Sequence, residues 1–264
     1  MSKIGFYGAG HMAEAMIHGL IESGMYQPEE IYVYNHRYEP TLKKVETAYH
    51  IQALVDEKEL FASVEVIVLA VQPQILINVL PTIKNYVTDN HLLVSVASGV
   101  SLEVIEAGLG AHKIARAMPN TPVTVGAGMS SISVNSYCTE KERQLLIQIF
   151  ESFGRAKILP ESQIDAVIGV SGSSPAYVYL FIEALADGAV AEGMSRQDAY
   201  EFAAQAVLGA AKMVLETGKH PAELKDAVCS PGGTTIAAVA SLEKDGFRSA
   251  VMNAVQAAIR KNRE

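Results

Sequence analysis

The sequence has few cysteines, no tryptophan and no excess of basic residues. Cys138 and Cys229 lie far apart, without the spacing of a metal site around either, so we expect reduced thiols and no bound metal. The net charge is −8, and no basic cluster is interleaved with aromatic residues. This charge pattern argues against a nucleic acid partner.

Long apolar runs are missing as well. The longest, residues 64–80, is interrupted by Glu65, Gln72, Pro73 and Gln74, whereas a membrane span needs about 20 mostly apolar residues. The N-terminus leads directly into a strand pattern and a glycine turn, unlike the apolar core of a signal peptide. We therefore expect a soluble, cytoplasmic protein without a membrane partner.

The chain does have 264 residues, 49% of them apolar, which is enough for two ordinary domains. Its first part alternates short β-branched runs with helical patterns, as is typical of βαβ units and a parallel sheet covered on both faces. The expected strands are residues 4–7, 31–34, 66–71, 92–96, 113–117, 123–134 and 156–159. The expected helices are residues 12–23, 73–86, 102–107 and 140–153.

From residue 161 the strand signal ends, and six helical segments follow. Two of them are rich in alanine and glycine and apolar on more than one face, more than a domain of about a hundred residues can cover. We therefore expect self-association through these helices. The predicted domains are residues 1–160 and 161–264. The predicted helix signals are Ser174-Pro175 with an end near Gly193, Ser195 to Gly218, a start at Pro221, and residues 236–244 and 247–261.

A glycine motif follows the first expected strand and opens the first helix: Gly8-Ala9-Gly10-His11-Met12-Ala13. This is the G-x-G-x-x-A form of the dinucleotide fingerprint. Gly8 permits the tight turn, Gly10 lets the backbone meet a pyrophosphate, and Ala13 allows close packing of helix on strand. The motif predicts a dinucleotide-binding domain.

The end of the second strand bears on the choice of dinucleotide. NAD enzymes usually carry Asp or Glu there, whereas this chain has Asn35 and Arg37. Arg37 can hold a phosphate by paired hydrogen bonds, and Asn35 can donate to it. The pattern favours NADP(H), with NAD(H) as the alternative if Arg37 is merely a solvated arginine.

A second glycine loop, Ser230-Pro231-Gly232-Gly233-Thr234-Thr235, lies between two helical patterns. We expect Thr234 or Thr235 to open the helix at residues 236–244. The free N–H groups of a helix N-terminus are a ready anion site, so a small carboxylate is a natural guest. An ordinary glycine turn with a threonine cap is the alternative.

The helical half offers few proton donors. His220 is its one histidine, and Lys225 and Asp226 are expected to be solvated. A carbonyl reductase normally needs an acid beside the substrate oxygen. An imine that arrives protonated needs none, so the sequence favours an imine carboxylate as the substrate.

Together these motifs resemble the pyrroline-5-carboxylate reductase family, over essentially the whole length. The stretches that carry the resemblance are Gly8–Ala13, Ala70-Val71-Gln72-Pro73, Ala117-Met118-Pro119-Asn120-Thr121-Pro122, Ser171-Gly172-Ser173-Ser174-Pro175-Ala176-Tyr177 and Ser230–Ile236.

The resemblance implies a Rossmann-like α/β N-terminal domain, an all-α C-terminal dimerisation domain and reduction of L-1-pyrroline-5-carboxylate to L-proline with NADPH. It places the carboxylate against the N–H groups of Gly232, Gly233 and Thr234, and the ring nitrogen near the Thr235 hydroxyl. The implied catalytic residues are Thr235 and Ser230. The implied cofactor residues are Tyr7, Gly8, Ala9, Gly10, His11, Met12, Asn35, Arg37, Ala70, Val71, Gln72, Pro73, Ala97, Ser98, Gly99 and Asn120.

The chain departs from the family pattern at Gln72, Ser174, Cys229 and Glu57. These changes leave one alternative open, a paralogue that binds NADP(H) without catalysis or with a shifted substrate. A second alternative is a hydroxyacid dehydrogenase, because that class also has a nucleotide domain followed by helices. The second would need a lysine facing the nicotinamide, and the sequence places none there.

Overall fold

The computed structural model describes residues 3–263, which divide into two compact units between Gly172 and Ser173. The predicted domain limits at residues 1 and 264 lie outside the described residues. The boundary predicted after residue 160 falls before a short helical segment, α7 (Ile164–Val167), that clusters with the first unit.

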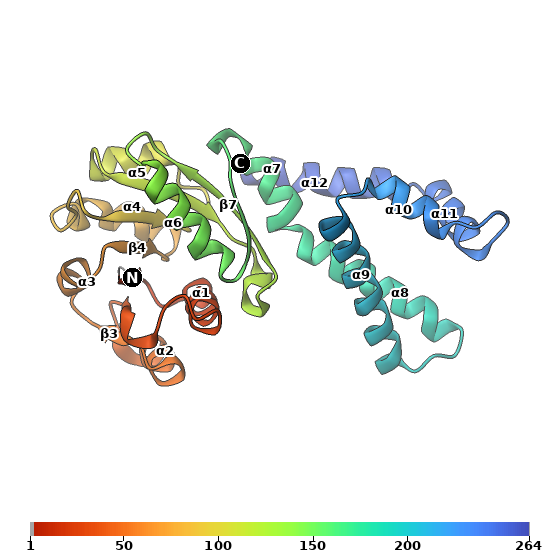
Figure 1. Cartoon of the computed structure of the whole chain (residues 1–264), viewed down its shortest axis with the longest axis horizontal. Coiled ribbons are helices and arrows are strands. Elements are labelled where there is room, and N and C mark those ends of the chain that lie inside the picture. The colour runs from red at the N-terminus through yellow and green to blue at the C-terminus, as the bar shows by residue number, and fades with distance from the viewer. Residues whose placement is uncertain (1–2, 264) are drawn as a thin grey trace. The chain divides into compact units, whose positions relative to one another are not determined.

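An eight-stranded sheet forms the centre of the first unit (Figure 1), with the strand order β3-β2-β1-β4-β5-β6-β7-β8. The predicted parallel sheet is confirmed, and it contains one antiparallel pair, β6 and β7, which the sequence prediction did not specify. The connection between them is too short for a crossover helix, and only an antiparallel return is possible. The strands are β1 (Ile4–Tyr7), β2 (Ile31–Tyr34), β3 (Gln52–Leu54), β4 (Val66–Leu69), β5 (Leu92–Ser95), β6 (Lys113–Met118), β7 (Gly128–Val134) and β8 (Gly154–Ile158).

Helices cover both faces of this sheet, as predicted. Buried residues of α1 (His11–Glu22), α2 (Lys43–Tyr49) and α6 (Glu140–Glu151) share one apolar core with the sheet. Those of α3 (Glu57–Ser63), α4 (Pro73–Ile83) and α5 (Leu102–Leu109) form the core on the other face. The central strands β1 and β4 are buried on both faces, which explains their continuous apolar sequence.

Two stretches of the first unit differ from the sequence prediction. Residues 123–134 were expected to form one strand, but Thr121–Val125 is a 3-10 helix and β7 begins only at Gly128. Pro122 and the left-handed Gly126 (φ 67°) break the extended pattern there. The elements α2, β3 and α3 were not anticipated, because each is short and largely polar on its outer side.

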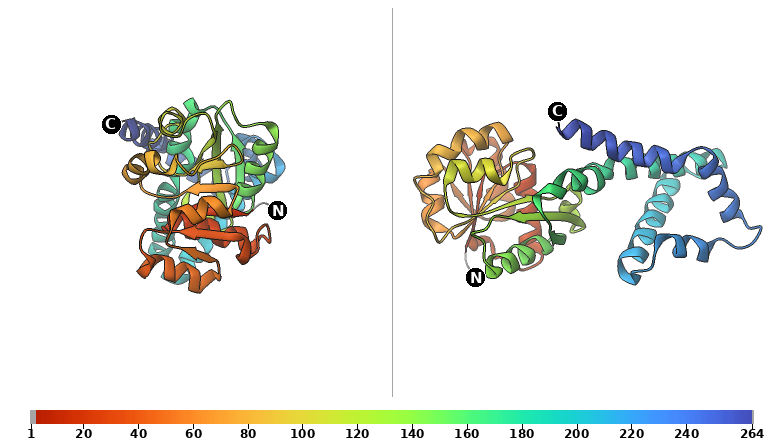
Figure 2. Two further views of the ribbon diagram at one scale, coloured as in Figure 1. Left: turned by 90° about the vertical axis from the view of Figure 1, so that its left-hand side faces the viewer. Right: turned by 90° about the horizontal axis from the view of Figure 1, so that it is seen from above.

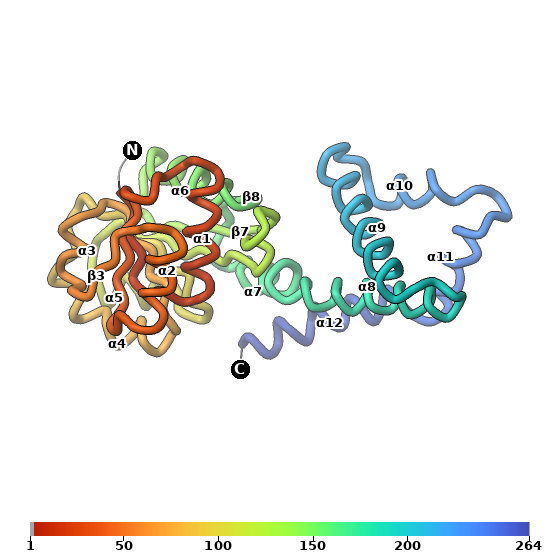
Figure 3. Tube along the Cα trace, turned by 90° about the horizontal axis from the view of Figure 1, so that it is seen from below, coloured from red at the N-terminus to blue at the C-terminus, as the bar shows by residue number. Residues whose placement is uncertain are grey.

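The second unit consists of α8 (Ser174–Ala191), α9 (Arg196–Thr217), α10 (Pro221–Val228), α11 (Thr234–Lys244) and α12 (Phe247–Arg263). Figure 2 and Figure 3 show α8 and α9 packed against each other, while α11 stands apart from α9. This unit leaves large apolar side chains exposed, including Leu180, Phe202 and Met252. Such exposure is typical of a surface that another protein covers.

The helix caps of the second unit follow the sequence in part. Ser195 caps α9 by accepting from the Asp198 N–H, and the left-handed Gly218 ends the helix, as predicted. The cap of α8 is Ser173, not Ser174, and its side chain makes no capping bond.

Within residues 3–263, no helix is long and apolar enough to cross a membrane. The same residues contain no group of three or more histidine, cysteine, aspartate or glutamate side chains arranged to hold a metal ion.

Candidate functional site

The turn between β1 and α1 has the geometry of a phosphate-binding loop. Gly8 adopts φ +112°, and a Cβ built on it would lie 2.6 Å from the Ala70 carbonyl oxygen. Gly10 is the N-cap of α1, and a Cβ built there would meet nothing within 4 Å. The first residue therefore requires glycine for the fold, whereas the second leaves open space above the N–H groups of the first turn, where an anion binds well.

The carboxyl ends of β4 and β5 lie beside this turn in the sheet. The Ala70 N–H donates to the Tyr7 carbonyl at 2.9 Å, which joins the end of β1 to the segment after β4. Gln72 is the N-cap of α4, and its side chain is exposed. In the segment after β5, Ala97 is buried, while Ser98 and the left-handed Gly99 (φ +78°) are exposed. The sequence-predicted residues of these three turns thus meet at one edge of the sheet, at the switch in strand order between β1 and β4.

The end of β2 contributes the next part of this edge. The Asn35 side-chain amide donates to the Arg37 carbonyl at 2.7 Å, which fixes the turn, and the Arg37 side chain is exposed. A cavity of about 470 Å³ opens between the ends of β1 and β2 and the helix α4. Its lining residues are Tyr7, Gly8, Tyr34, Asn35, His36, Glu57, Val71, Ile75, Val79 and Thr82.

Glu57 belongs to this cavity, although the sequence argument did not count it among the site residues. It is the first residue of α3, and its carboxylate accepts a hydrogen bond from the Tyr7 hydroxyl at 2.7 Å. Burial and this carboxylate raise the pKa of Tyr7, so the hydroxyl stays a proton donor. The sequence had pointed to Glu57 only as a departure from the family pattern, because the third strand that places it at this edge was not recognised.

Asn120 follows β6, and its side chain is used by the protein itself. Its amide nitrogen donates to the Ser171 carbonyl at 2.9 Å, and its amide oxygen accepts from the Met129 N–H at 2.8 Å. These bonds tie the loop after β6 to β7 and to the end of the first unit. Asn120 therefore holds the shape of this loop, whatever contact its backbone makes with a cofactor.

In the second unit, the glycine loop forms a tight turn before α11. The Gly233 N–H donates to the Ser230 carbonyl at 3.0 Å, and Gly232, the third residue of this turn, takes φ +67°, a value that favours glycine. Gly233 is the N-cap of α11, and a Cβ built on it would lie 2.3 Å from the Ser230 hydroxyl.

This turn corrects one expectation and sharpens another. Neither threonine is the cap: Thr234 is the first residue of α11, so the helix begins two residues earlier than the predicted Ile236. The N–H groups of Thr234 and Thr235 thus belong to the first helical turn, which has no preceding carbonyls to accept them. The Thr235 side chain is half-buried beside them. The arrangement can bind a small carboxylate through backbone N–H groups and present a hydroxyl next to it.

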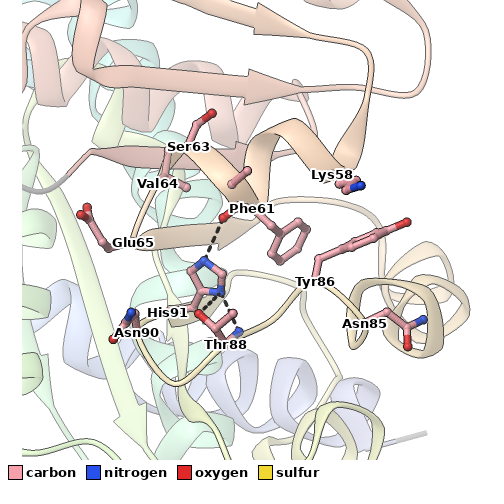
Figure 4. Close-up of a pocket in the computed structure, with 11 residues that line it drawn as sticks. Lys58, Phe61, Ser63, Val64, Glu65, Asn85, Tyr86, Thr88, Asn90 and His91 are labelled. Carbon is pink, nitrogen blue, oxygen red and sulfur yellow. Dashed lines mark hydrogen bonds between the residues drawn. The ribbon is translucent and has the colours of Figure 1, made fainter.

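A second cavity of about 470 Å³ lies at the opposite, amino ends of β4 and β5 (Figure 4). Its central side chain, His91, is 5% exposed, accepts from the Thr88 N–H at 2.9 Å and contacts the Phe61 carbonyl at 2.9 Å through Nε2. Both ring nitrogens are therefore satisfied by the fold. We assign this cavity no catalytic role, because the carboxyl edge carries the glycine turns.

Two family models match the chain. Residues 3–99 match the family described as NADP oxidoreductase, coenzyme F420-dependent, and residues 161–264 match pyrroline-5-carboxylate reductase dimerisation. The second match covers the helices that expose apolar side chains.

Curated relatives and solved structures resemble the chain over its full length. Pyrroline-5-carboxylate reductase of Escherichia coli is 48% identical over 98% of this chain and 97% of its own. The structure of a pyrroline-5-carboxylate reductase from Coxiella burnetii superposes with a TM-score of 0.93 at 34% identity, covering 99% of this chain and 97% of that one. The Plasmodium falciparum pyrroline carboxylate reductase, solved with NADP bound, gives a TM-score of 0.85 at 34% identity with the same coverage.

Proposed function

The chain belongs to the pyrroline-5-carboxylate reductase family, and from this membership we propose that it reduces L-1-pyrroline-5-carboxylate to L-proline with NADPH, the last step of proline biosynthesis. It is an oxidoreductase that acts on a C=N bond. The observation that carries the substrate assignment is the α11 N-terminus, where a glycine turn presents N–H groups beside the Thr235 hydroxyl.

The first unit fits the dinucleotide. The space above Gly10 and the first turn of α1 suits the pyrophosphate, and Arg37 is exposed and able to pair with a 2′-phosphate. The segments Ala70–Pro73 and Ala97–Gly99 would line the nicotinamide half. When bound there, NADPH supplies the hydride that the imine carbon accepts.

The glycine loop would hold the substrate. The N–H groups of Gly232 and Thr234 bind the carboxylate, and the helix N-terminus favours its negative charge. The Gly233 N–H, which the sequence also assigned to the carboxylate, is taken by the Ser230 carbonyl at 3.0 Å. The protonated ring nitrogen donates to the Thr235 hydroxyl, while Ser230 keeps the turn closed through its bond with Gly233. This orientation exposes the C=N bond for attack without a separate acid, because the substrate arrives with its proton.

After hydride addition the C=N bond is a C–N single bond, and the ring nitrogen is a secondary amine. The amine keeps the proton that the imine brought and takes another from water. No side chain has to transfer a proton in this scheme, which agrees with a loop whose recognition groups are backbone N–H groups and one hydroxyl.

We also propose that the enzyme works as a homo-oligomer built on a dimer of the helical domain. The exposed apolar side chains of α8, α9 and α12 support this, as does the match to a dimerisation family. A cytoplasmic location is proposed from the two free thiols, Cys138 and Cys229, because reducing compartments keep thiols in this form.

The test is a steady-state assay with pyrroline-5-carboxylate and NADPH, applied to the wild type and to Thr235→Ala. We expect the variant to lose turnover by about 10- to 1000-fold, the range for one transition-state hydrogen bond or somewhat less. Ser241→Ala, a hydroxyl deletion farther along α11 on its exposed surface, is the matched control and should keep wild-type turnover.

Three outcomes would change the assignment. Full activity of Thr235→Ala would remove the proposed role of its hydroxyl. Tight NADPH binding without turnover of any cyclic imine would identify a non-catalytic or shifted-substrate paralogue. Turnover of a hydroxy acid instead would place the chain with the hydroxyacid dehydrogenases.

A further inference from the structure

The cavity between β1, β2 and α4 is the place for the adenosine half of a dinucleotide. In a doubly wound sheet the pyrophosphate lies over the first glycine turn, and the adenosine ribose lies toward the end of the second strand. Here the cavity runs from Gly8 to Asn35 and His36, which spans that distance. A charged side chain in this wall would act directly on the ribose and its substituents.

Glu57 is such a side chain, and the fold holds it in place. Its Oε2 atom accepts from the hydroxyl of Tyr7, which is 4% exposed and whose ring lies 4.8 Å from that of Tyr34. The tyrosine hydroxyl has one proton to donate, so the second carboxylate oxygen keeps its capacity to accept. The carboxylate is thereby fixed at the cavity wall and ready for another donor.

The charge of Glu57 is not balanced within the cavity. None of the residues that line it is lysine or arginine, and within residues 3–263 no salt bridge includes Glu57. Lys58 follows Glu57 directly in the sequence, but it is exposed and lies outside the lining set. Arg37, at the end of β2, is likewise exposed and outside the lining set. The ribose end of the site thus combines an exposed cation with a fixed anion.

We propose that Glu57 determines the selectivity between the two nicotinamide cofactors. Its carboxylate accepts a hydrogen bond from the free 2′-hydroxyl of NADH and repels the 2′-phosphate of NADPH, whereas Arg37 attracts that phosphate. An acidic residue that reads the ribose hydroxyls usually follows the second strand; in this chain it comes from the start of α3. The preference for NADPH is therefore smaller than Arg37 alone would produce. This inference rests on the proposed dinucleotide function.

The test measures nucleotide binding directly, by titration calorimetry of the full-length enzyme with NADPH and with NADH, in the absence of any imine. Glu57→Gln keeps the size of the side chain and removes its charge. We expect the Kd for NADPH to fall about 3- to 10-fold and the Kd for NADH to rise about 3- to 10-fold, because one repulsion and one accepted hydrogen bond are lost.

Two further variants make the result decisive. Glu59→Gln removes a carboxylate from the exposed side of the same helix, outside the cavity lining, and should leave both Kd values unchanged. Glu57→Ala removes the charge in a different way and should shift the ratio in the same direction as Glu57→Gln, which covers the case in which one variant folds poorly.

The outcomes separate this inference from the function on which it rests. If both nucleotides bind the wild type and neither Glu57 variant changes the ratio of their Kd values, Glu57 does not set the selectivity. If neither nucleotide binds the wild type, the dinucleotide function itself is wrong and the inference is overturned with it.

Discussion

Gly8 and Gly10 form a pair whose replacement by alanine should separate folding from nucleotide binding. In Gly8→Ala the new Cβ would lie 2.6 Å from the Ala70 carbonyl oxygen and 2.8 Å from a Val71 methyl group, at a φ of +112°. Real Cβ atoms do not approach a backbone oxygen so closely, so the turn between β1 and α1 must shift. In Gly10→Ala the φ of −74° is ordinary, and the Cβ would point into open space.

These geometries predict different costs. For Gly8→Ala, the disfavoured φ and the overpacked contact together cost about 2–5 kcal/mol, a large share of a typical stability of about 5–15 kcal/mol. For Gly10→Ala, the weaker N-cap and the reduced entropy of the unfolded chain nearly cancel, so stability changes by about 0.5 kcal/mol or less. Its methyl group instead occupies the space proposed for the pyrophosphate, and we expect the Kd for NADPH to rise about tenfold or more.

Urea unfolding followed by circular dichroism measures the first effect, and calorimetric titration with NADPH measures the second. The wild type and Gly24→Ala complete the set: Gly24 also has a positive φ, +71°, but its added Cβ would meet nothing within 4 Å. Gly24→Ala should therefore lose only the stability that corresponds to the strained φ, and it should keep the wild-type affinity for NADPH. Wild-type stability of Gly8→Ala, or wild-type affinity of Gly10→Ala, would refute the assignment of roles within the fingerprint.

Three further predictions concern the charged and polar groups. Arg37→Ala should raise the KM for NADPH about tenfold and leave that for NADH unchanged, since one charge-assisted contact to the 2′-phosphate is lost; equal effects on both would contradict this. Glu161→Gln should destabilise the first unit by about 2–4 kcal/mol in urea unfolding, because it leaves the buried Arg116 guanidinium, 2.8 Å from the carboxylate, without its counter-charge. The control is Glu39→Gln, which breaks an exposed ion pair with Lys43 and should cost about 0.5 kcal/mol or less. Burial lowers the pKa of His91 below the ordinary 6.5, so below pH 6.5 the folded state binds fewer protons than the unfolded state. The free energy of unfolding should therefore fall as the pH decreases below 6.5, and it should fall less in His91→Gln.

The order of the main elements could be predicted from sequence because burial on both faces leaves a clear pattern. The strands at Ile4–Tyr7 and Ile31–Tyr34 were placed with their observed bounds, since each is a short apolar run followed by a turn residue. The antiparallel direction of β7 was harder to predict from the sequence. Whether a strand runs parallel or antiparallel to β6 depends on the length of the connection, and the 3-10 helix at Thr121–Val125 was mistaken for part of the strand.

The candidate site shows the same limit at the level of side chains. A glycine that needs a positive φ, such as Gly8 or Gly232, leaves a sequence motif, so both loops could be located before the fold was known. Glu57 leaves no such motif, because its position depends on a three-residue strand, β3, and on a hydrogen bond to Tyr7, 50 residues away. Residues that bind through the backbone are therefore predictable from local sequence. A carboxylate that reaches the same cavity from another strand becomes visible only once the sheet has brought the strand ends together. For this reason the proposed role of Glu57 in the choice between NADPH and NADH could be formulated only from the structure.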